Sequence, residues 1–133
     1  MPLFTSNFEP NLPFKNGHFN TMYRPLFMKE FCKYTRKRIV TWDDDFIDLD
    51  FSFTDSNTLA LLIHGLEGSA QSKYMLSTSN ELNAQKIDTV CLNLRGCSGE
   101  DNRLLSTYHS GKTDDVDFII KHLLSEYNYE NII

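Results

Sequence analysis

The sequence predicts an α/β fold, in which a mostly parallel sheet carries crossover helices. Two short apolar runs, residues 59–63 and 89–94, are the main evidence. Each run is shorter than an ordinary helix and ends at a glycine turn, which is typical of parallel strands buried on both faces. About one helix separates the runs, so together they predict a right-handed strand, helix, strand crossover. Ligands of open α/β sheets bind beyond the carboxyl ends of the strands, so we expect functional residues in the two glycine turns.

The chain before the first apolar run is expected to contribute antiparallel edge strands. Residues 38–42 and 46–53 predict two strands joined by an acidic turn. In the second strand the apolar residues alternate with polar ones: Ile47, Leu49, Phe51 and Phe53 with Asp48, Asp50 and Ser52. This alternation predicts an edge strand with one buried and one solvated face. Residues 1–37 show no clear period and predict an irregular segment laid over the sheet, so that residues 1–133 form one partial domain with its sheet and helices in residues 38–133.

Two helices are expected between and after the parallel strands. Residues 72–86 carry apolar side chains at near-helical spacing. The later helix has a stronger apolar stripe, formed by Val116, Ile119, Ile120, Leu123, Leu124 and Tyr127. Thr113 is predicted to cap its N-terminus, where Asp114 and Asp115 suit the helix dipole. The chain then ends in a strand at residues 131–133.

The composition is that of a globular protein, with a heavy aromatic load of ten Phe, six Tyr and one Trp that argues against disorder. The net charge of -5 argues against a nucleic-acid partner. We recognise no apolar run of about 20 residues and no signal peptide, so we expect a cytoplasmic location. The three cysteines have no CxxC spacing, so free thiols are expected. The acidic segment lacks the glycine and final glutamate of a calcium loop, so no metal is expected. No cofactor is expected either.

A basic cluster in the N-terminal part leaves two interpretations open. Its members are Arg24, Lys29, Lys33, Arg36, Lys37 and Arg38. A solvated face is favoured, and weak contact with an anionic membrane surface is the alternative.

The polar run at residues 95–111 predicts a structured loop at the active-site edge of the sheet. Arg95 and Arg103 are expected to pair there with carboxylates such as Glu100 or Asp101.

Four motifs carry a resemblance to one family. They are His-Gly-Leu-Glu-Gly-Ser at residues 64–69, the long run Asn-Leu-Arg-Gly-Cys-Ser-Gly-Glu-Asp-Asn-Arg-Leu at residues 93–104, Tyr-His-Ser-Gly at residues 108–111 and Asn-Gly-His-Phe-Asn-Thr at residues 16–21. Together they resemble the YheT-like hydrolases, the fourth family of the α/β-hydrolase superfamily, although Asn20 stands where that family usually has Gln. The resemblance implies the N-terminal part of an α/β-hydrolase fold, ending in the strand before the nucleophile elbow.

The resemblance also implies a chemistry, that of a serine carboxylic-ester hydrolase of esterase or lipase type. During acyl transfer negative charge grows on the carbonyl oxygen, and fixed N–H donors stabilise it. By resemblance, the backbone N–H of Leu66 supplies one donor from a turn formed with His64 and Gly65, and the residue after the nucleophilic serine supplies the other. Tyr108 and His109 are expected to line the pocket for a small ester or lipid substrate. For His18 a structural hydrogen-bonding role is favoured, and lining the pocket is the alternative.

The resemblance places the rest of the machinery outside these residues. The family's Gly-x-Ser-x-Gly elbow, its acid and its histidine all follow the elbow strand, so no triad member is expected within residues 1–133. The chain alone is therefore expected to be inactive, an open reading frame is expected to continue past Ile133, and the remainder of the hydrolase domain is expected as a partner.

Two other functions remain open at this point. Ser98 could form a compact triad with His109 and Asp114 or Asp115, but a nucleophile elbow needs glycine two residues after the serine, and Glu100 stands there. The other alternative is a non-catalytic binding module with a hydrolase-like fold, which an exposed edge at the last strand would favour.

Overall fold

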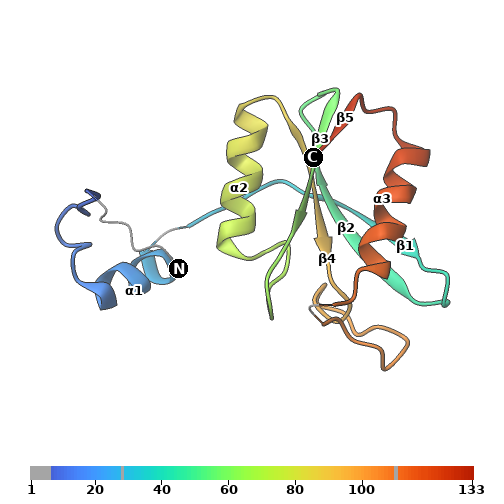
Figure 1. Cartoon of the computed structure of the whole chain (residues 1–133), viewed down its shortest axis with the longest axis horizontal. Coiled ribbons are helices and arrows are strands. Elements are labelled where there is room, and N and C mark those ends of the chain that lie inside the picture. Colours follow the sequence, from blue (N-terminus) through green and yellow to red (C-terminus); the bar gives the residue numbers. More distant parts are fainter. Residues whose placement is uncertain (1–6, 28, 110) are drawn as a thin grey trace.

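A computed structural model describes residues 7–27, 29–109 and 111–133 of the chain. These residues form a five-stranded mixed sheet with a helix on each face and an N-terminal helix that stands apart from the sheet (Figure 1). The strands are β1 (Thr35–Val40), β2 (Phe46–Ser52), β3 (Thr58–Ile63), β4 (Asp88–Asn93) and β5 (Asn131–Ile132). The helices are α1 (Gly17–Phe27), α2 (Lys73–Ala84) and α3 (Asp114–Glu126).

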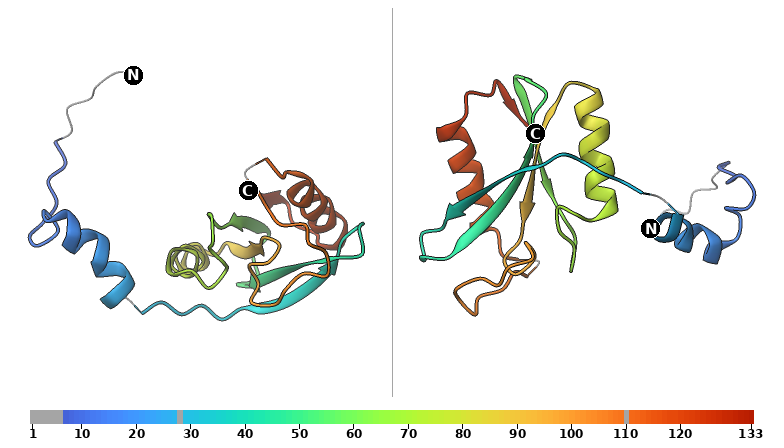
Figure 2. Two further views of the ribbon diagram at one scale, coloured as in Figure 1. Left: turned by 90° about the horizontal axis from the view of Figure 1, so that it is seen from below. Right: turned by 180° about the vertical axis from the view of Figure 1, so that it is seen from behind.

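The strand order is β1-β2-β4-β3-β5. β2 is antiparallel to both β1 and β4, whereas β3 is parallel to β4 and to β5. The crossover helix α2 connects β3 to β4 on one face of the sheet, and α3 connects β4 to β5 on the other (Figure 2). The predicted fold class, antiparallel edge strands leading into a parallel sheet with crossover helices, is confirmed.

The larger core lies between the sheet and α3. Its fully buried members are Ile47, Leu49, Phe51, Leu59, Val90, Leu92, Ile119 and Leu123. The smaller core, on the α2 side, contains Ala70, Met75 and Cys91. α2 also contacts this face through hydrogen bonds, such as that between Ser79 Oγ and Tyr34 Oη at 2.8 Å. The sheet is therefore covered on both faces, as a parallel strand such as β3 requires.

The prediction of a solvated face on β2 is wrong. β2 lies between β1 and β4 and is buried along its whole length. Asp48 and Asp50 are 1% and 2% exposed, and each accepts two hydrogen bonds from an arginine of the edge strand β1, Arg38 and Arg36 respectively. Burial would raise the pKa of Asp48, but the hydrogen bonds from Arg38 outweigh it and lower that pKa. Two members of the basic cluster thus bind carboxylates.

The prediction of an irregular N-terminal segment laid over the sheet is wrong for Gly17–Phe27. This range forms α1, which begins where Asn16 Oδ1 accepts the N–H groups of His18 and Phe19, an N-cap contact. Phe19, Tyr23 and Phe27 then follow at four-residue spacing and contact one another along the helix. α1 lies beyond α2, away from the sheet (Figures 1 and 2), and Arg24 Nη2 donates to Ser77 Oγ of α2 at 2.6 Å.

The two sheet helices are confirmed at α2 and α3, with one correction. Thr113 precedes α3 but makes no side-chain capping hydrogen bond. Three aspartates in the first turn, among them Asp114 and Asp115, place negative charge at the positive end of the helix dipole instead. None of the helices in the described ranges combines the length and apolar character that a bilayer crossing demands.

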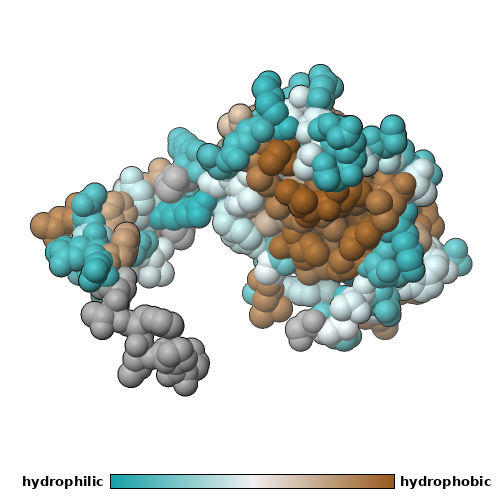
Figure 3. Space-filling model, turned by 45° about the horizontal axis from the view of Figure 1, so that its top comes forward, coloured by the Kyte–Doolittle hydropathy of each residue, from teal (hydrophilic) through white to brown (hydrophobic). Residues whose placement is uncertain are grey.

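An apolar edge surface lies beside β5, between the open edge of the sheet and α3 (Figure 3). It is formed by Leu61, Ile63, Val116, Ile120, Leu124, Ile132 and Ile133. Leu124 and Ile133 are 62% and 67% exposed. Exposed apolar clusters of this kind mark surfaces that another segment or protein covers.

Candidate oxyanion site

The carboxyl ends of β3 and β4 lie side by side, because these parallel strands pair Ile63 with Leu92. Both glycine turns therefore meet at one edge of the sheet. A hydrogen bond joins them directly, since the Leu94 N–H donates to Nε2 of His64 at 3.1 Å. The predicted placement of the two turns is confirmed.

His64 has a structural position in this turn and is only 4% exposed. Because its Nε2 accepts from Leu94, the neutral ring carries its proton on Nδ1, which donates to the Gly65 carbonyl at 2.8 Å. The same carbonyl accepts the Gly68 N–H at 3.0 Å. These two bonds fix the Gly65–Leu66 peptide group. Its N–H points opposite to its carbonyl, as in any trans peptide, and so away from His64.

The N–H of Leu66 differs from its neighbours in having no hydrogen-bond partner among the described residues. Every other N–H from Gly65 to Ser72 has an acceptor: Tyr74 Oη for Gly65, Tyr108 Oη for Glu67, Gly65 O for Gly68, Ser72 Oγ for Ser69, Asn93 Oδ1 for Ala70, Ser69 Oγ for Gln71 and Ser69 O for Ser72. The turn thus presents one unpaired donor on an otherwise saturated backbone.

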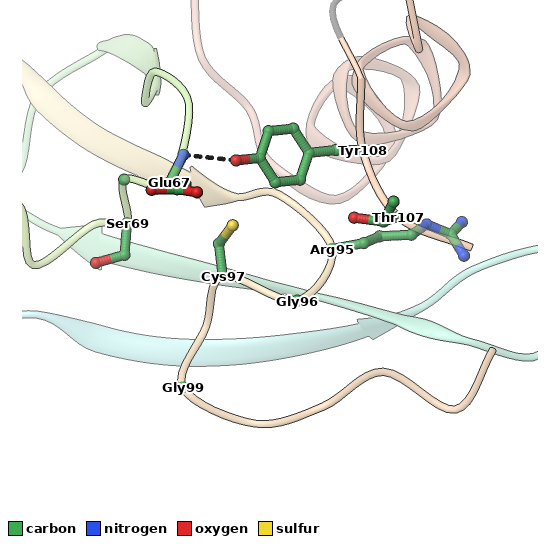
Figure 4. A pocket seen from close by; sticks show the side chains of 9 residues that line it. Glu67, Ser69, Arg95, Gly96, Cys97, Gly99, Thr107 and Tyr108 are labelled. Carbon is green, nitrogen blue, oxygen red and sulfur yellow. Dashed lines mark hydrogen bonds between the residues drawn. The ribbon is translucent and has the colours of Figure 1, made fainter. Parts of the chain in front are cut away.

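Two tyrosines from different elements hold the turn. The Gly65 N–H donates to Tyr74 Oη of α2 at 2.8 Å, and the Glu67 N–H donates to Tyr108 Oη of the loop after β4 at 2.6 Å (Figure 4). Gly68 is required by this packing, because a Cβ there would lie 2.9 Å from Tyr74 Oη and 3.0 Å from the Gly65 carbonyl.

Two cavities flank the turn. One, of about 470 Å³, lies between the turn and the loop after β4, and its wall includes Glu67, Cys97 and Tyr108 (Figure 4). The other, of about 650 Å³, is lined by Ile63, His64, Gly65, Leu66, Leu94, Tyr108, His109, Lys112, Thr113 and Val116. Tyr108 contributes to both cavities. The wall of the larger one is rich in apolar side chains, which suits the acyl part of an ester.

The loop after β4 is structured, as predicted, but its ion pairs differ from the expected ones. Arg95 is buried and binds Asp43 at 2.8 Å, Asp45 at 3.1 Å and Asp115 at 2.8 Å. Glu100, an expected partner of Arg95, instead binds Arg38 at 2.6 Å. The prediction considered only carboxylates nearby in sequence, whereas the loop folds against the β1–β2 hairpin and the start of α3.

These contacts shift the pKa values of Asp43 and Arg95. Burial alone would raise the pKa of Asp43, but hydrogen bonds from Arg95 and Thr41 outweigh it and hold that pKa at about 2. Hydrogen bonds to Asp115 raise the pKa of Arg95 above its ordinary value. Asp43 and Arg95 are therefore both charged at neutral pH.

The structure brings together five of the six residues expected at the site. His64, Gly65, Leu66, Tyr108 and His109 all line the larger cavity. His18 lies on α1, beyond α2, and the structure does not bring it to this site (Figure 1). Tyr74 is a contact that the sequence analysis missed, because its position on the helix predicts only packing.

The compact triad around Ser98 is not assembled. The Ser98 hydroxyl is buried, and Asp115 is bound to Arg95. His109 Nδ1 accepts the Gly111 N–H at 3.2 Å, and no contact in the described ranges joins His109 to Ser98. Within the same residues no group of three or more His, Cys, Asp or Glu side chains could hold a metal ion.

Comparisons with known proteins identify the relatives of this site. No family model matches the sequence. Over 131 residues the chain is 33% identical to the candidate esterase YheT of Escherichia coli (strain K12), covering 94% of this chain and 38% of that protein. The chain is similar to the N-terminal part of the YheT-like α/β-hydrolases. It is also 30% identical to the phospholipase ABHD3 of Homo sapiens in an alignment of 136 residues that covers 95% of this chain and 33% of that protein. The chain thus spans well under half the length of these relatives.

Solved structures show the same fold. An α/β serine hydrolase from Xanthomonas campestris superimposes with a TM-score of 0.62 at 15% identity, over 79% of this chain and 51% of that one. The Pyrococcus furiosus esterase Pf2001 superimposes with a TM-score of 0.58 at 19% identity, over 75% of this chain and 40% of that one. The described residues therefore have the fold of the N-terminal part of an α/β-hydrolase.

Proposed function

We propose that this chain is the N-terminal part of a serine carboxylic-ester hydrolase and supplies half of its oxyanion hole through the Leu66 N–H. The nucleophile, the second donor and the catalytic acid and base would come from residues beyond these, since residues 1–133 contain no Gly-x-Ser-x-Gly sequence. An esterase and a phospholipase among the relatives support an ester or lipid substrate. A cytoplasmic location is part of the proposal.

The observation that carries this proposal is the unpaired Leu66 N–H on a turn whose other N–H groups are bonded. An oxyanion donor must be free to bind the developing charge and must already point at it, so that no reorganisation is needed during reaction. Fixing the Gly65 carbonyl meets the second requirement, and the missing acceptor meets the first. Such a donor contributes about 3–4 kcal/mol of transition-state stabilisation.

The apolar edge surface supports the remainder of the domain as partner. It adjoins β5, the outer parallel strand of the described sheet, and consists of aliphatic side chains from β3, α3 and the C-terminal residues. Adding a further strand or helix there would bury these side chains.

The decisive experiment replaces the Leu66 N–H group by an oxygen in the whole hydrolase. Replacing the Gly65–Leu66 amide by an ester through the α-hydroxy analogue of leucine deletes the Leu66 N–H and keeps the side chain. We expect kcat to fall by about 10²–10³-fold. The matched control makes the same replacement at Leu105, a fully exposed leucine outside both cavities. An unchanged kcat with the ester at residue 66, in a protein that melts normally, would exclude Leu66 as a donor.

A non-catalytic binding module is the second candidate, and the exposure of the apolar edge surface is the observation that favours it. A fluorophosphonate probe separates the two candidates. Labelling of a serine outside residues 1–133 in the whole protein supports the hydrolase. Absence of labelling at any serine supports the binding module, and labelling at Ser98 in residues 1–133 alone would restore the compact enzyme.

A further inference from the structure

We infer that Tyr108 is a positioning residue, which aims the Leu66 N–H by holding the next peptide group of the turn. This inference rests on the proposed function. It also assigns Tyr108 a role other than the substrate contact expected from the sequence, because its hydroxyl binds the protein backbone at 2.6 Å.

Leu66 lies between two peptide groups. Its N–H belongs to the first, and a fixed second group limits the rotations about Leu66 that would tilt the first. His64 and Gly68 hold the first through the Gly65 carbonyl. Tyr108 holds the second, because the N–H that it accepts belongs to Glu67. The Leu66 side chain is 85% exposed and provides no anchor of its own.

The second peptide group needs such a restraint. Glu67 has a φ of 54°, in the left-handed region that residues other than glycine seldom occupy. A backbone in this region is retained only where its surroundings hold it. The Tyr108 hydroxyl provides a fixed acceptor at this position, and the Tyr108 ring lies edge-on to His64, with 6.3 Å between ring centroids.

Tyr108 lies on a loop whose earlier part is anchored to the β1–β2 hairpin. Asp45 is fully buried and accepts hydrogen bonds from Asn102 Nδ2 and from the Arg103 N–H, both at 2.9 Å. Asn102 Oδ1 in turn accepts the Gly96 N–H at 2.6 Å. These bonds fold the loop after β4 so that Tyr108 reaches across to the turn after β3 (Figure 4).

The test is Tyr108→Phe in the whole hydrolase, which keeps the ring and removes only the hydroxyl. Glu67 can then bond to water, so the protein should remain folded while the Leu66 N–H is held only from its Gly65 side. Because small misplacements of a catalytic group cost rate, we expect kcat to fall about 10-fold. KM should stay within about twofold, because the variant keeps the Tyr108 ring that lines the cavities and removes only a hydroxyl that is bonded to the backbone.

The matched control is Tyr129→Phe. The Tyr129 hydroxyl donates to Asp88 Oδ2 at 2.9 Å and lines neither cavity, so its loss should affect stability and leave kcat unchanged. A second comparison places Tyr108→Phe in the protein with the ester at residue 66. If Tyr108 acts through the Leu66 N–H, it should change kcat by less than about twofold in that background.

Each outcome either supports or overturns the inference. A 10-fold loss of kcat that vanishes in the ester background supports it. A rise in KM alone would make Tyr108 a substrate contact, and an equal loss in both backgrounds would mean that it acts independently of Leu66. Either result, or a wild-type kcat, overturns the inference while the proposed function stands. If the ester alone has no effect, the proposed function itself has failed.

Discussion

Replacing Arg95 by methionine tests whether one buried guanidinium holds three parts of the chain together. Its side chain binds Asp43 and Asp45 of the β1–β2 hairpin and Asp115 of α3. Asp45 and Asp115 are 0% and 2% exposed, so the variant leaves both carboxylates buried without their cation. Removing one partner of a buried ion pair costs about 3–5 kcal/mol. A domain has only about 5–15 kcal/mol of unfolding free energy, so this loss takes a large part of it.

Urea unfolding of residues 1–133 followed by circular dichroism measures the effect. With a slope near 2 kcal/mol per molar urea, the midpoint should fall by about 2 M. Arg103→Met is the matched control, because within the described part of the chain the Arg103 guanidinium hydrogen-bonds only to the exposed Asp44 carbonyl. Its change should stay within about 0.5 kcal/mol. A midpoint of Arg95→Met within about 0.3 M of the wild type would refute the idea that the cluster holds the fold together.

Three further predictions follow from individual contacts. The folded pKa of Asp43, about 2, lies below the value of about 3.9 in an unfolded chain, so its contribution is present above the unfolded value and lost as pH falls through the folded one. Asp43→Asn should therefore lose less stability than the wild type between about pH 4 and 2, measured by urea midpoints across that range. Gly68→Ala should cost about 1–3 kcal/mol because its Cβ meets Tyr74 Oη and the Gly65 carbonyl, whereas Gly65→Ala, with no contact closer than 3.7 Å, should cost clearly less in the same assay. In amide hydrogen exchange followed by NMR, the Glu67 N–H should be protected and the Leu66 N–H should exchange freely; equal protection of both would contradict the donor geometry.

Local patterns predict most of the sheet, because the parallel strands β3 and β4 each coincide with a short apolar run, which is buried along all of β4 and at Leu59 and Ala60 of β3. The position of the run at residues 59–63 before a glycine turn gives the edge of the sheet at which the site lies. The solvated face predicted for β2 is wrong because alternation shows only that a strand has two different faces. It does not show whether water or an arginine contacts the carboxylates of Asp48 and Asp50. That depends on β1, whose Arg36 and Arg38 register opposite them.

The same distinction between local patterns and contacts of distant residues applies to the site. The position of the turn at residues 64–69 could be predicted, because the end of the apolar run and the two glycines mark it in the sequence. The contact between Tyr108 and Glu67 could not be predicted from the sequence, because the two residues lie 41 positions apart. The contact exists only when the intervening loop has folded. The aromatic spacing of α1 was present in the sequence at Phe19, Tyr23 and Phe27, and reading it as periodic would have predicted the helix.

The groups that orient the Leu66 N–H all belong to this chain. His64 and Gly68 hold one adjoining peptide group, and Tyr108 holds the other. All three lie within the described residues, as does Asp45, which anchors the loop that carries Tyr108. An electrostatic donor is effective when its direction is set before the reaction begins. The buried charges around Arg95 therefore support the site, because they hold the loop from which Tyr108 reaches the turn, and Arg95 itself lines the smaller cavity.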